Sequence, residues 1–199
     1  MKREIELTVK SNMPINKCKE KLKIAGYTLE KELHVKDIYM RSKDVSLQSS
    51  NEEILKRSVL VRDVVKNKSS VHEKELVYKE KEYNEKGEIV SSNKYIVHID
   101  SVEKAVVFLE KIGYVKLLEI EDMYTEYSKG EVVIGLQDVK DLGAFIEVEE
   151  TIKHREITDE MRIREDLKQY LLDTKLDIDA SNFDVKKVFL ALDNMRKRK

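Results

Sequence analysis

The stretch VVIGLQDVKDLGAFIEVEET, residues 132–151, indicates the fold more clearly than any other part of the chain. Residues 132–139 and 144–151 are predicted strands, and Asp141-Leu142-Gly143 between them is the predicted turn. A turn this short joins antiparallel neighbours. The sequence therefore predicts an antiparallel strand pair here, and we interpret the rest of the chain around it.

Two acidic pairs lie on predicted strands. Glu147 and Glu149 belong to the second strand of this pair, whereas Glu4 and Glu6 belong to residues 2–10, where apolar and polar residues alternate. The members of each pair share a face because side chains alternate along a strand with period two. If the strands close into a barrel, both pairs can face its interior, where carboxylates need cations or paired partners. Such carboxylates would attract Mg²⁺ or Mn²⁺; the competing interpretation is a solvated face in a chain rich in glutamate.

The first half of the chain predicts a helix followed by strands. Residues 15–25 carry apolar side chains at helical spacing, and Gly26 ends the pattern. Residues 27–41 and 54–65 are predicted strands. The polar stretch 42–53 between them is a predicted flexible loop.

The second half repeats this arrangement. Residues 73–83 and 94–99 are predicted strands joined by a turn at residues 84–88. Ser101 then caps a predicted helix with one apolar stripe, and Gly113 ends it. Two amphipathic helices are predicted farther along, the first opening at Thr158 or Asp159 and the second spanning residues 184–195.

Short internal matches connect the two halves. KIAGY at residues 23–27 resembles EKIGY at residues 110–114, and their glycines are 87 residues apart. KDIYM at residues 36–40 resembles EDMYT at residues 121–125, which lies 85 residues later. A strand, helix, strand, strand order that occurs twice predicts a duplicated unit and one sheet shared between two related halves.

Composition narrows the class of protein. The 199 residues suit one domain, and 38 Lys+Arg against 39 Asp+Glu leave no global basic field for nucleic acid or an anionic membrane. The single cysteine, Cys18, excludes an intrachain disulfide and a cysteine-based zinc cluster and suits a reducing compartment. No signal region or apolar run of membrane-spanning length occurs. We expect a cytoplasmic protein without nucleic-acid or membrane partners, and the sequence leaves a homodimer open.

Basic side chains on predicted strands offer the opposite chemistry. Arg62 ends one apolar run, and Lys79 and Lys81 share a face of another strand. Phosphate groups bind to such donors, Arg in a two-pronged manner and Lys as a point charge. A Gly-rich phosphate loop, a nucleophile elbow and a zinc-protease motif are all missing, and the four histidines share no metal-ligand spacing.

Taken in order, these residues resemble the CYTH family, which includes class IV adenylyl cyclases and thiamine triphosphatases and is also called the triphosphate tunnel metalloenzymes. The resemblance covers nearly the whole chain, from Glu4 to about Leu192. The matching segments are E-x-E at residues 4–6, D-x-Y at 37–39, the last arginine of L-R-x-R at 59–62, L-x-x-K at 76–79, a Gly-aromatic pair at 113–114 and, most specifically, V-x-x-L-G-x-F-x-E-x-E at 139–149.

The resemblance implies an α+β fold: a closed eight-stranded antiparallel β tunnel built from duplicated β-α-β-β halves, with helices packed outside. It implies a single domain over residues 1–199. The tunnel strands and two helices would occupy residues 1–151, and C-terminal helices would occupy residues 152–199.

The resemblance also implies the roles of the charged residues. Inward Glu4, Glu6, Glu147 and Glu149 would hold Mg²⁺ or Mn²⁺, and Glu147 and Glu149 would also be catalytic. The triphosphate of a phosphorylated small-molecule substrate would be bound by Arg62, Lys79 and Lys81.

Several basic positions of the family are replaced in this chain. Thr8 stands where the family has Lys, Leu60 where it has Arg, and Asp122 and Tyr124 where it has a K-x-R segment. Each lost contact to a charged phosphate costs about 1.5–3 kcal/mol. The sequence therefore predicts a divalent-metal-dependent phosphohydrolase or adenylyl cyclase-like protein acting on a triphosphate-containing substrate, weakened or altered by these losses. The alternative is a non-catalytic CYTH-fold binding protein whose acidic tunnel holds a metal or a cationic ligand.

Overall fold

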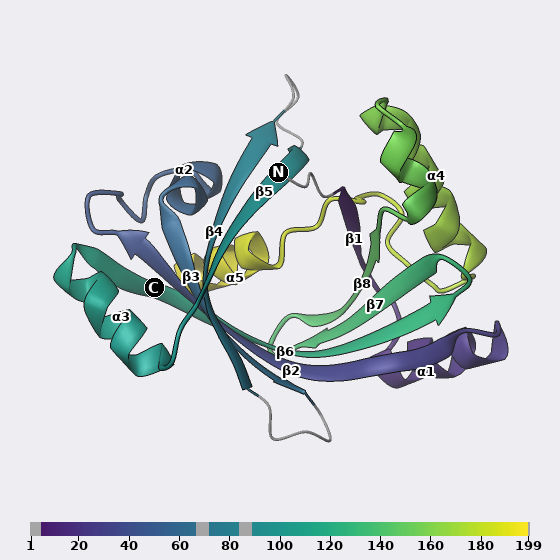
Figure 1. Ribbon diagram of the computed structural model, residues 1–199, viewed down its shortest axis with the longest axis horizontal. Helices are drawn as coiled ribbons and strands as arrows, with labels where there is room; N and C mark the ends of the chain where they lie inside the picture. Colours follow the sequence, from purple (N-terminus) through teal and green to yellow (C-terminus); the bar gives the residue numbers. More distant parts are fainter. Residues whose placement is uncertain (1–4, 67–71, 84–88, 199) are drawn as a thin grey trace.

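The computed structural model describes residues 5–66, 72–83 and 89–198, which form an eight-stranded antiparallel sheet with helices around it (Figure 1). The strands are β1 (Glu6–Lys10), β2 (Thr28–Ser42), β3 (Ser58–Lys66), β4 (His72–Tyr83), β5 (Ile89–His98), β6 (Tyr114–Lys129), β7 (Val132–Val139) and β8 (Gly143–Glu149). The helices are α1 (Ile15–Ile24), α2 (Asn51–Lys56), α3 (Val102–Lys111), α4 (Glu160–Asp173), α5 (Lys187–Lys197) and a 3-10 helix at Ile152–Glu156. In the described part of the chain, no helix has the length and apolar character needed to cross a membrane.

The strand order reflects the predicted duplication. The sheet runs β1-β8-β7-β6-β2-β3-β4-β5, with the long strands β2 and β6 paired at its centre. Exchanging β1 with β5, β2 with β6, β3 with β7 and β4 with β8 returns the same order read backwards. Each half therefore contributes one strand, one helix and three further strands, one strand more than the sequence matches predict.

The sheet is not closed by hydrogen bonds between its edges. In the described strands, β1 and β5 stand at opposite ends of the strand order, so the expected closed tunnel is a strongly curved sheet. The C-terminal segment takes the outer backbone groups of β1: Thr8 N donates to Phe183 O at 3.1 Å, and Val185 N donates to Thr8 O at 2.9 Å. These groups are consequently not available to pair with β5.

Helix capping explains one local difference from the sequence prediction. Residues 54–56, predicted as the start of a strand, belong to α2. The Ser50 side chain accepts a hydrogen bond from Glu53 N at 3.2 Å, and Glu52 and Glu53 occupy the first turn, where negative charge is favourable. The buried side chain of Ile54 anchors this short helix, and β3 begins only at Ser58.

The helices pack on both faces of the sheet. On the outer face, α1 and α4 cover one apolar cluster, which includes Leu7, Leu22 and Leu167, and α3 covers another. Helix α5 lies inside the curve of the sheet, although all helices were expected outside (Figure 1). Its Val188 and Leu192 pack against inward side chains of the strands, so α5 fills part of the space that the curved sheet encloses.

Candidate functional site

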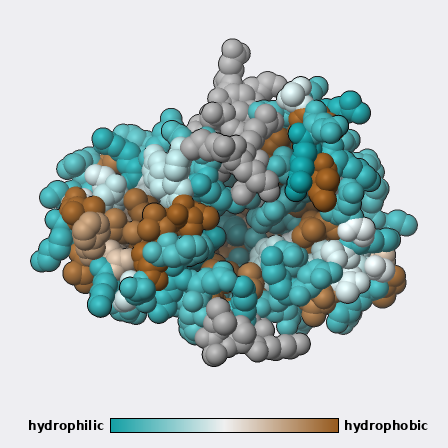
Figure 2. Space-filling model, viewed as in Figure 1, coloured by the Kyte–Doolittle hydropathy of each residue, from teal (hydrophilic) through white to brown (hydrophobic). Residues whose placement is uncertain are grey.

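A cavity of about 380 Å³ lies between the inner face of the sheet and the start of α5. Figure 2 shows a hollow with hydrophilic walls at the centre of the view. Among the described residues, as many basic as acidic side chains line the cavity. The acidic lining residues are Glu6, Asp37, Asp122, Glu126, Glu147, Glu149 and Asp184, and the basic ones are Lys31, Arg62, Lys79, Lys94, Arg164, Lys186 and Lys187.

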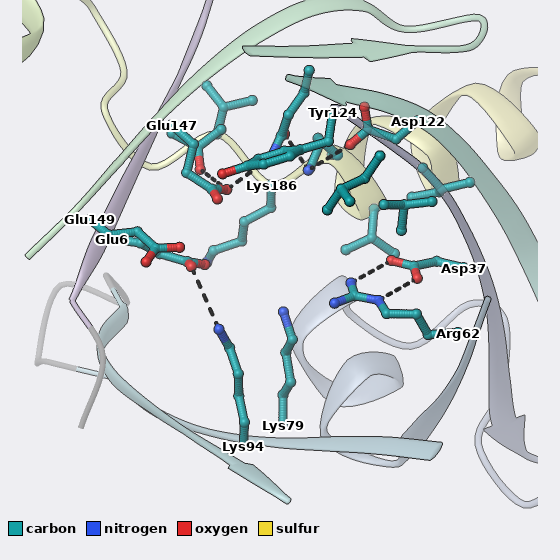
Figure 3. A pocket seen from close by; sticks show the side chains of 18 of the residues that line it. Glu6, Asp37, Arg62, Lys79, Lys94, Asp122, Tyr124, Glu147, Glu149 and Lys186 are labelled. Carbon is teal, nitrogen blue, oxygen red and sulfur yellow. Dashed lines mark hydrogen bonds and ion pairs between the residues drawn. The ribbon is translucent and has the colours of Figure 1, made fainter. Parts of the chain in front are cut away.

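Three of the four predicted metal ligands converge. Glu6 on β1 lies directly opposite Glu149 in the β1–β8 register, and Glu147 shares its face of β8. One carboxylate oxygen from each of these three residues lies within 4.8 Å of the other two. Figure 3 shows the three side chains pointing into the cavity from adjacent strands. Glu4, the fourth predicted ligand, lies outside the described residues.

The electrostatics of this glutamate group favour a cation. Burial raises the pKa of Glu147, and the negative charge of Glu6 raises it further. Two neutral donors meet one oxygen of Glu147: Thr8 Oγ1 at 3.4 Å and Gln137 Nε2 at 3.2 Å. Three carboxylates held this close repel one another, and oxygen ligands of this kind suit a hard divalent cation. The residues present therefore fit Mg²⁺ or Mn²⁺.

Two lysines form the facing wall of the cavity. Lys79 on β4 and Lys94 on β5 are cross-strand partners, and Figure 3 shows both amino groups pointing into the cavity, that of Lys94 toward Glu6. Lys94 Nζ lies 4.0 Å from Glu6 Oε2. Burial lowers the pKa of Lys79, and no hydrogen bond or ion pair engages its amino group within the described residues. Lys79 is consequently the cation best placed to receive an anion; the side chain of Lys81 lies outside the described part of the chain.

Arg62 lies in the cavity as predicted, but a carboxylate already engages it. Its Nε donates to Asp37 Oδ1 at 2.7 Å, and its second nitrogen donates to Asp37 Oδ2 at 2.8 Å. The two residues are cross-strand partners on β2 and β3, and Asp37 is buried. This two-pronged pair uses the same donors that a phosphate would need. Arg62 therefore has fewer hydrogen-bond donors available for an incoming anion than its charge alone indicates.

No role was predicted for Lys187, which α5 places in the cavity. Its amino group donates a hydrogen bond to Gln137 Oε1 and lies 3.6 Å from Asp122 Oδ2. Lys187 thus places a basic group beside the part of β6 that carries Asp122 and Tyr124 in place of the expected basic residues. The only sequence signal was a Lys-Lys pair at the start of a predicted amphipathic helix, and that pattern does not say on which face of the sheet the helix lies.

Asp122 is a buried carboxylate that lines the cavity. Its Oδ1 atom is buried and has no hydrogen-bond partner among the described residues. Burial raises the pKa of Asp122 to about 6, with the charges of Glu147 and Asp37 adding to the shift and Lys187 opposing it. The ionised form of Asp122 at neutral pH therefore lowers the stability of the folded state.

Tyr124 narrows the cavity beside Glu147, and a glycine makes room for it. A Cβ atom at Gly135 would lie 2.7 Å from Tyr124 Cε2, which is too close for any side chain. The Tyr124 hydroxyl donates to Glu126 Oε2 at 3.1 Å, which fixes the direction of the ring. A bulky neutral side chain thus stands where the family resemblance leads one to expect a base.

Comparison with known proteins bears on the fold. No protein-family model matches this chain, and no curated protein matches its sequence. Among solved structures, the PH1819 protein from Pyrococcus horikoshii OT3 has a TM-score of 0.70 and 21% identity, covering 96% of this chain and 99% of that chain. A "putative adenylate cyclase" from Vibrio parahaemolyticus has a TM-score of 0.68 and 17% identity, covering 96% and 98%.

A third solved structure has a more informative description. HpAC1 from Hippeastrum, described as a "putative adenylyl cyclase" with a dominant triphosphatase activity, has a TM-score of 0.55 and 14% identity, covering 98% of this chain and 96% of that chain. The shared property is the fold. These neighbours share the α+β architecture over nearly their whole length, so the comparison shows the fold.

Proposed function

We propose that this protein binds a divalent cation and a triphosphate-containing small molecule together in the cavity and hydrolyses the terminal phosphate. The observation that carries the proposal is the arrangement of Glu6, Glu147 and Glu149 on one wall and Lys79 and Lys94 on the facing wall. A cation site and an anion site that face each other across one cavity are suited to a metal–polyphosphate complex.

Each wall has a defined task in binding. Glu6, Glu147 and Glu149 would hold Mg²⁺ or Mn²⁺, which when bound neutralises phosphate charge and polarises the phosphoryl group. Lys79 donates to phosphate oxygens, and the loss of solvation that lowers its pKa strengthens its attraction for an anion inside the cavity. Lys94, already 4.0 Å from Glu6, connects the two walls.

Hydrolysis needs a proton acceptor near the terminal phosphorus. Water attacks phosphorus, the bond to the bridging oxygen breaks, and the shorter polyphosphate leaves with the electron pair. We assign the water proton to Glu149 or Glu147, because these two carboxylates lie on the same face of β8 and are the predicted catalytic residues. Lys79 stabilises the negative charge that builds up on the departing phosphate.

The proposed reaction is hydrolysis of the triphosphate and not cyclisation of ATP. The Hippeastrum neighbour carries a cyclase description, yet its dominant activity is described as triphosphatase. A cyclase must also hold the ribose hydroxyl of ATP in line with phosphorus, whereas a triphosphatase needs only water there.

The test is phosphate release from inorganic triphosphate, thiamine triphosphate and ATP, with Mg²⁺ or Mn²⁺, alongside measurement of cyclic AMP. We expect metal-dependent phosphate release that Glu147→Gln abolishes. Glu150→Gln is the matched control, because it makes the same chemical change just past the end of β8, outside the glutamate group. Absence of phosphate release with all three substrates, or equal release by both variants, would contradict the proposal.

A second candidate function follows from the internal ion pairs. Asp37 engages Arg62, and Gln137 and Asp122 engage Lys187, so part of the basic lining is neutralised before any ligand enters. This pairing favours a non-catalytic protein that uses the glutamate group to bind a metal or a cationic ligand. Its signature would be a thermal shift with Mn²⁺ alone that triphosphate does not increase.

A further inference from the structure

Helices α1 and α3 occupy equivalent positions in the two halves of the molecule. The 87-residue offset that aligns Gly26 with Gly113 also aligns the buried residues of the two helices. Cys18 and Leu22 in α1 correspond to Ala105 and Leu109 in α3, and all four are buried against the sheet. The two helices therefore need the same inner face, and α1 shows what the fold requires on the outer face.

The outer faces of the two helices differ. Where α1 has Glu20 and Lys21, α3 has Val107 and Phe108, which are 51% and 59% exposed. Ile112, just past the end of α3, is 56% exposed. Because α1 occupies the equivalent place with charged residues, the packing of the fold does not explain the apolar side chains of α3. Grouped exposed apolar side chains of this size mark a contact surface.

This apolar surface extends from α3 toward β4 and β5. Leu76 of β4 packs against the cluster that contains Ala105 and Leu109, and Val97 of β5 is its cross-strand partner. Val97 is exposed, as is the neighbouring pair Tyr78 and Tyr95. At the other edge of the sheet, α4 covers the equivalent strands β8 and β1 and buries Ile163, Leu167 and Leu171. Much of the corresponding apolar surface at the β4–β5 edge stays exposed.

The charges beside Val107 and Phe108 fit a second copy of the chain. Exposed Glu103 and Lys104 stand near the start of α3, and exposed Glu110 and Lys111 stand near its end. In an antiparallel two-fold pairing, the start of one helix meets the end of the other. Lys104 then faces Glu110 of the partner subunit, and Glu103 faces Lys111 of the partner subunit. The helix dipoles also run in opposite directions, and a formal charge of -1 per chain adds little repulsion.

We propose that α3 and the adjoining outer face of β4 and β5 form a two-fold interface between two copies of this chain. The interface is isologous, with the same patch on each subunit, which is the commonest arrangement in homodimers. Val107 and Phe108 lie at its centre, and the four charged residues fix the antiparallel direction. This inference does not depend on the proposed function, because the patch lies on the opposite side of the sheet from the cavity.

Sedimentation velocity of the full chain over a range of concentrations tests the interface. We expect a concentration-dependent dimer, and we expect Val107→Glu with Phe108→Lys to weaken it about 10-fold or more, as for central apolar contacts. The double variant installs the residues of α1 at the same positions, so its thermal unfolding should match that of the wild type. Met161→Glu removes an equally exposed apolar side chain from α4 and should leave the dimer intact. A monomeric wild type, or a dimer insensitive to the α3 variant, overturns the proposal.

A charge-exchange experiment tests the pairing direction separately. Lys104→Glu in one copy and Glu110→Lys in another should each weaken self-association, because each places like charges opposite each other. A mixture of the two variants should restore association, since both cross-contacts regain opposite charges. Absence of any recovery on mixing would contradict the antiparallel α3 pairing.

Discussion

The two edge pairs of the sheet, β1 with β8 and β5 with β4, hold equivalent places in the two halves and carry opposite charge. Glu6 and Glu149 are cross-strand partners on the first pair, and Lys79 and Lys94 are cross-strand partners on the second. The curvature of the sheet brings these pairs to opposite walls of one cavity. The duplicated backbone therefore supplies the geometry, whereas divergence between the halves supplies the chemistry.

Substitutions in the glutamate wall, formed by Glu6, Glu147 and Glu149, should have the largest effect, and this effect is on metal binding. Glu147→Gln removes a ligand and should lower Mn²⁺ affinity about 100-fold or more, since even indirect partners of metal sites are worth 10–100-fold. The same change removes a buried like charge, so the metal-free variant should unfold at a higher temperature than the wild type. Calorimetric titration and thermal unfolding measure the two effects, with Glu150→Gln as the control. Unchanged Mn²⁺ affinity would show that the glutamates do not form a metal site.

The lysine wall should show the next largest effect, on anions rather than metals. Lys79→Met should weaken triphosphate binding about 10- to 100-fold, which corresponds to the loss of one charged hydrogen bond. Mn²⁺ affinity should stay the same or rise, because a positive charge is removed. Lys74→Met on the opposite face of β4 is the control. If triphosphate affinity changes equally in both variants, Lys79 has no special place in binding.

Asp122, between the two walls, should show the smallest effect, and it depends on pH. Its pKa is raised from 3.8 to about 6 in the folded state, so between these values the folded state holds the proton more tightly than the unfolded state. The free energy of unfolding should therefore fall as pH rises through this window. Asp122→Asn should raise the free energy of unfolding by about 1–3 kcal/mol at pH 7, and this increase should become smaller below pH 4. Urea unfolding at both pH values checks this, with Asp138→Asn as an exposed control. A gain independent of pH would argue against this titration.

Side-chain alternation explains what the sequence predicted well. The spacing of Glu147 and Glu149 places both on the inner face, and the repeated glycines Gly26 and Gly113 end equivalent helices. These features depend on local backbone geometry, which short patterns encode directly.

Long-range packing explains what the sequence did not predict. The amphipathic pattern of α5 does not show whether the helix packs on the inner or the outer face of the sheet. The position of Lys187 in the cavity was therefore not predicted. The pairing of Arg62 with Asp37 depends on the β2–β3 register, which single-strand patterns do not specify. The open edge of the sheet depends on the segment near Phe183, whose backbone binds Thr8 from the far end of the chain.

Calorimetric titration of a non-hydrolysable triphosphate analogue into the protein, with and without Mn²⁺, tests most directly whether the two walls act together. A cation bound by the glutamates should raise triphosphate affinity by about 10-fold or more, since sites of opposite charge in one cavity are coupled. The gain should vanish in Glu147→Gln. Triphosphate binding of equal strength in the presence and absence of Mn²⁺ would contradict a shared metal–polyphosphate site.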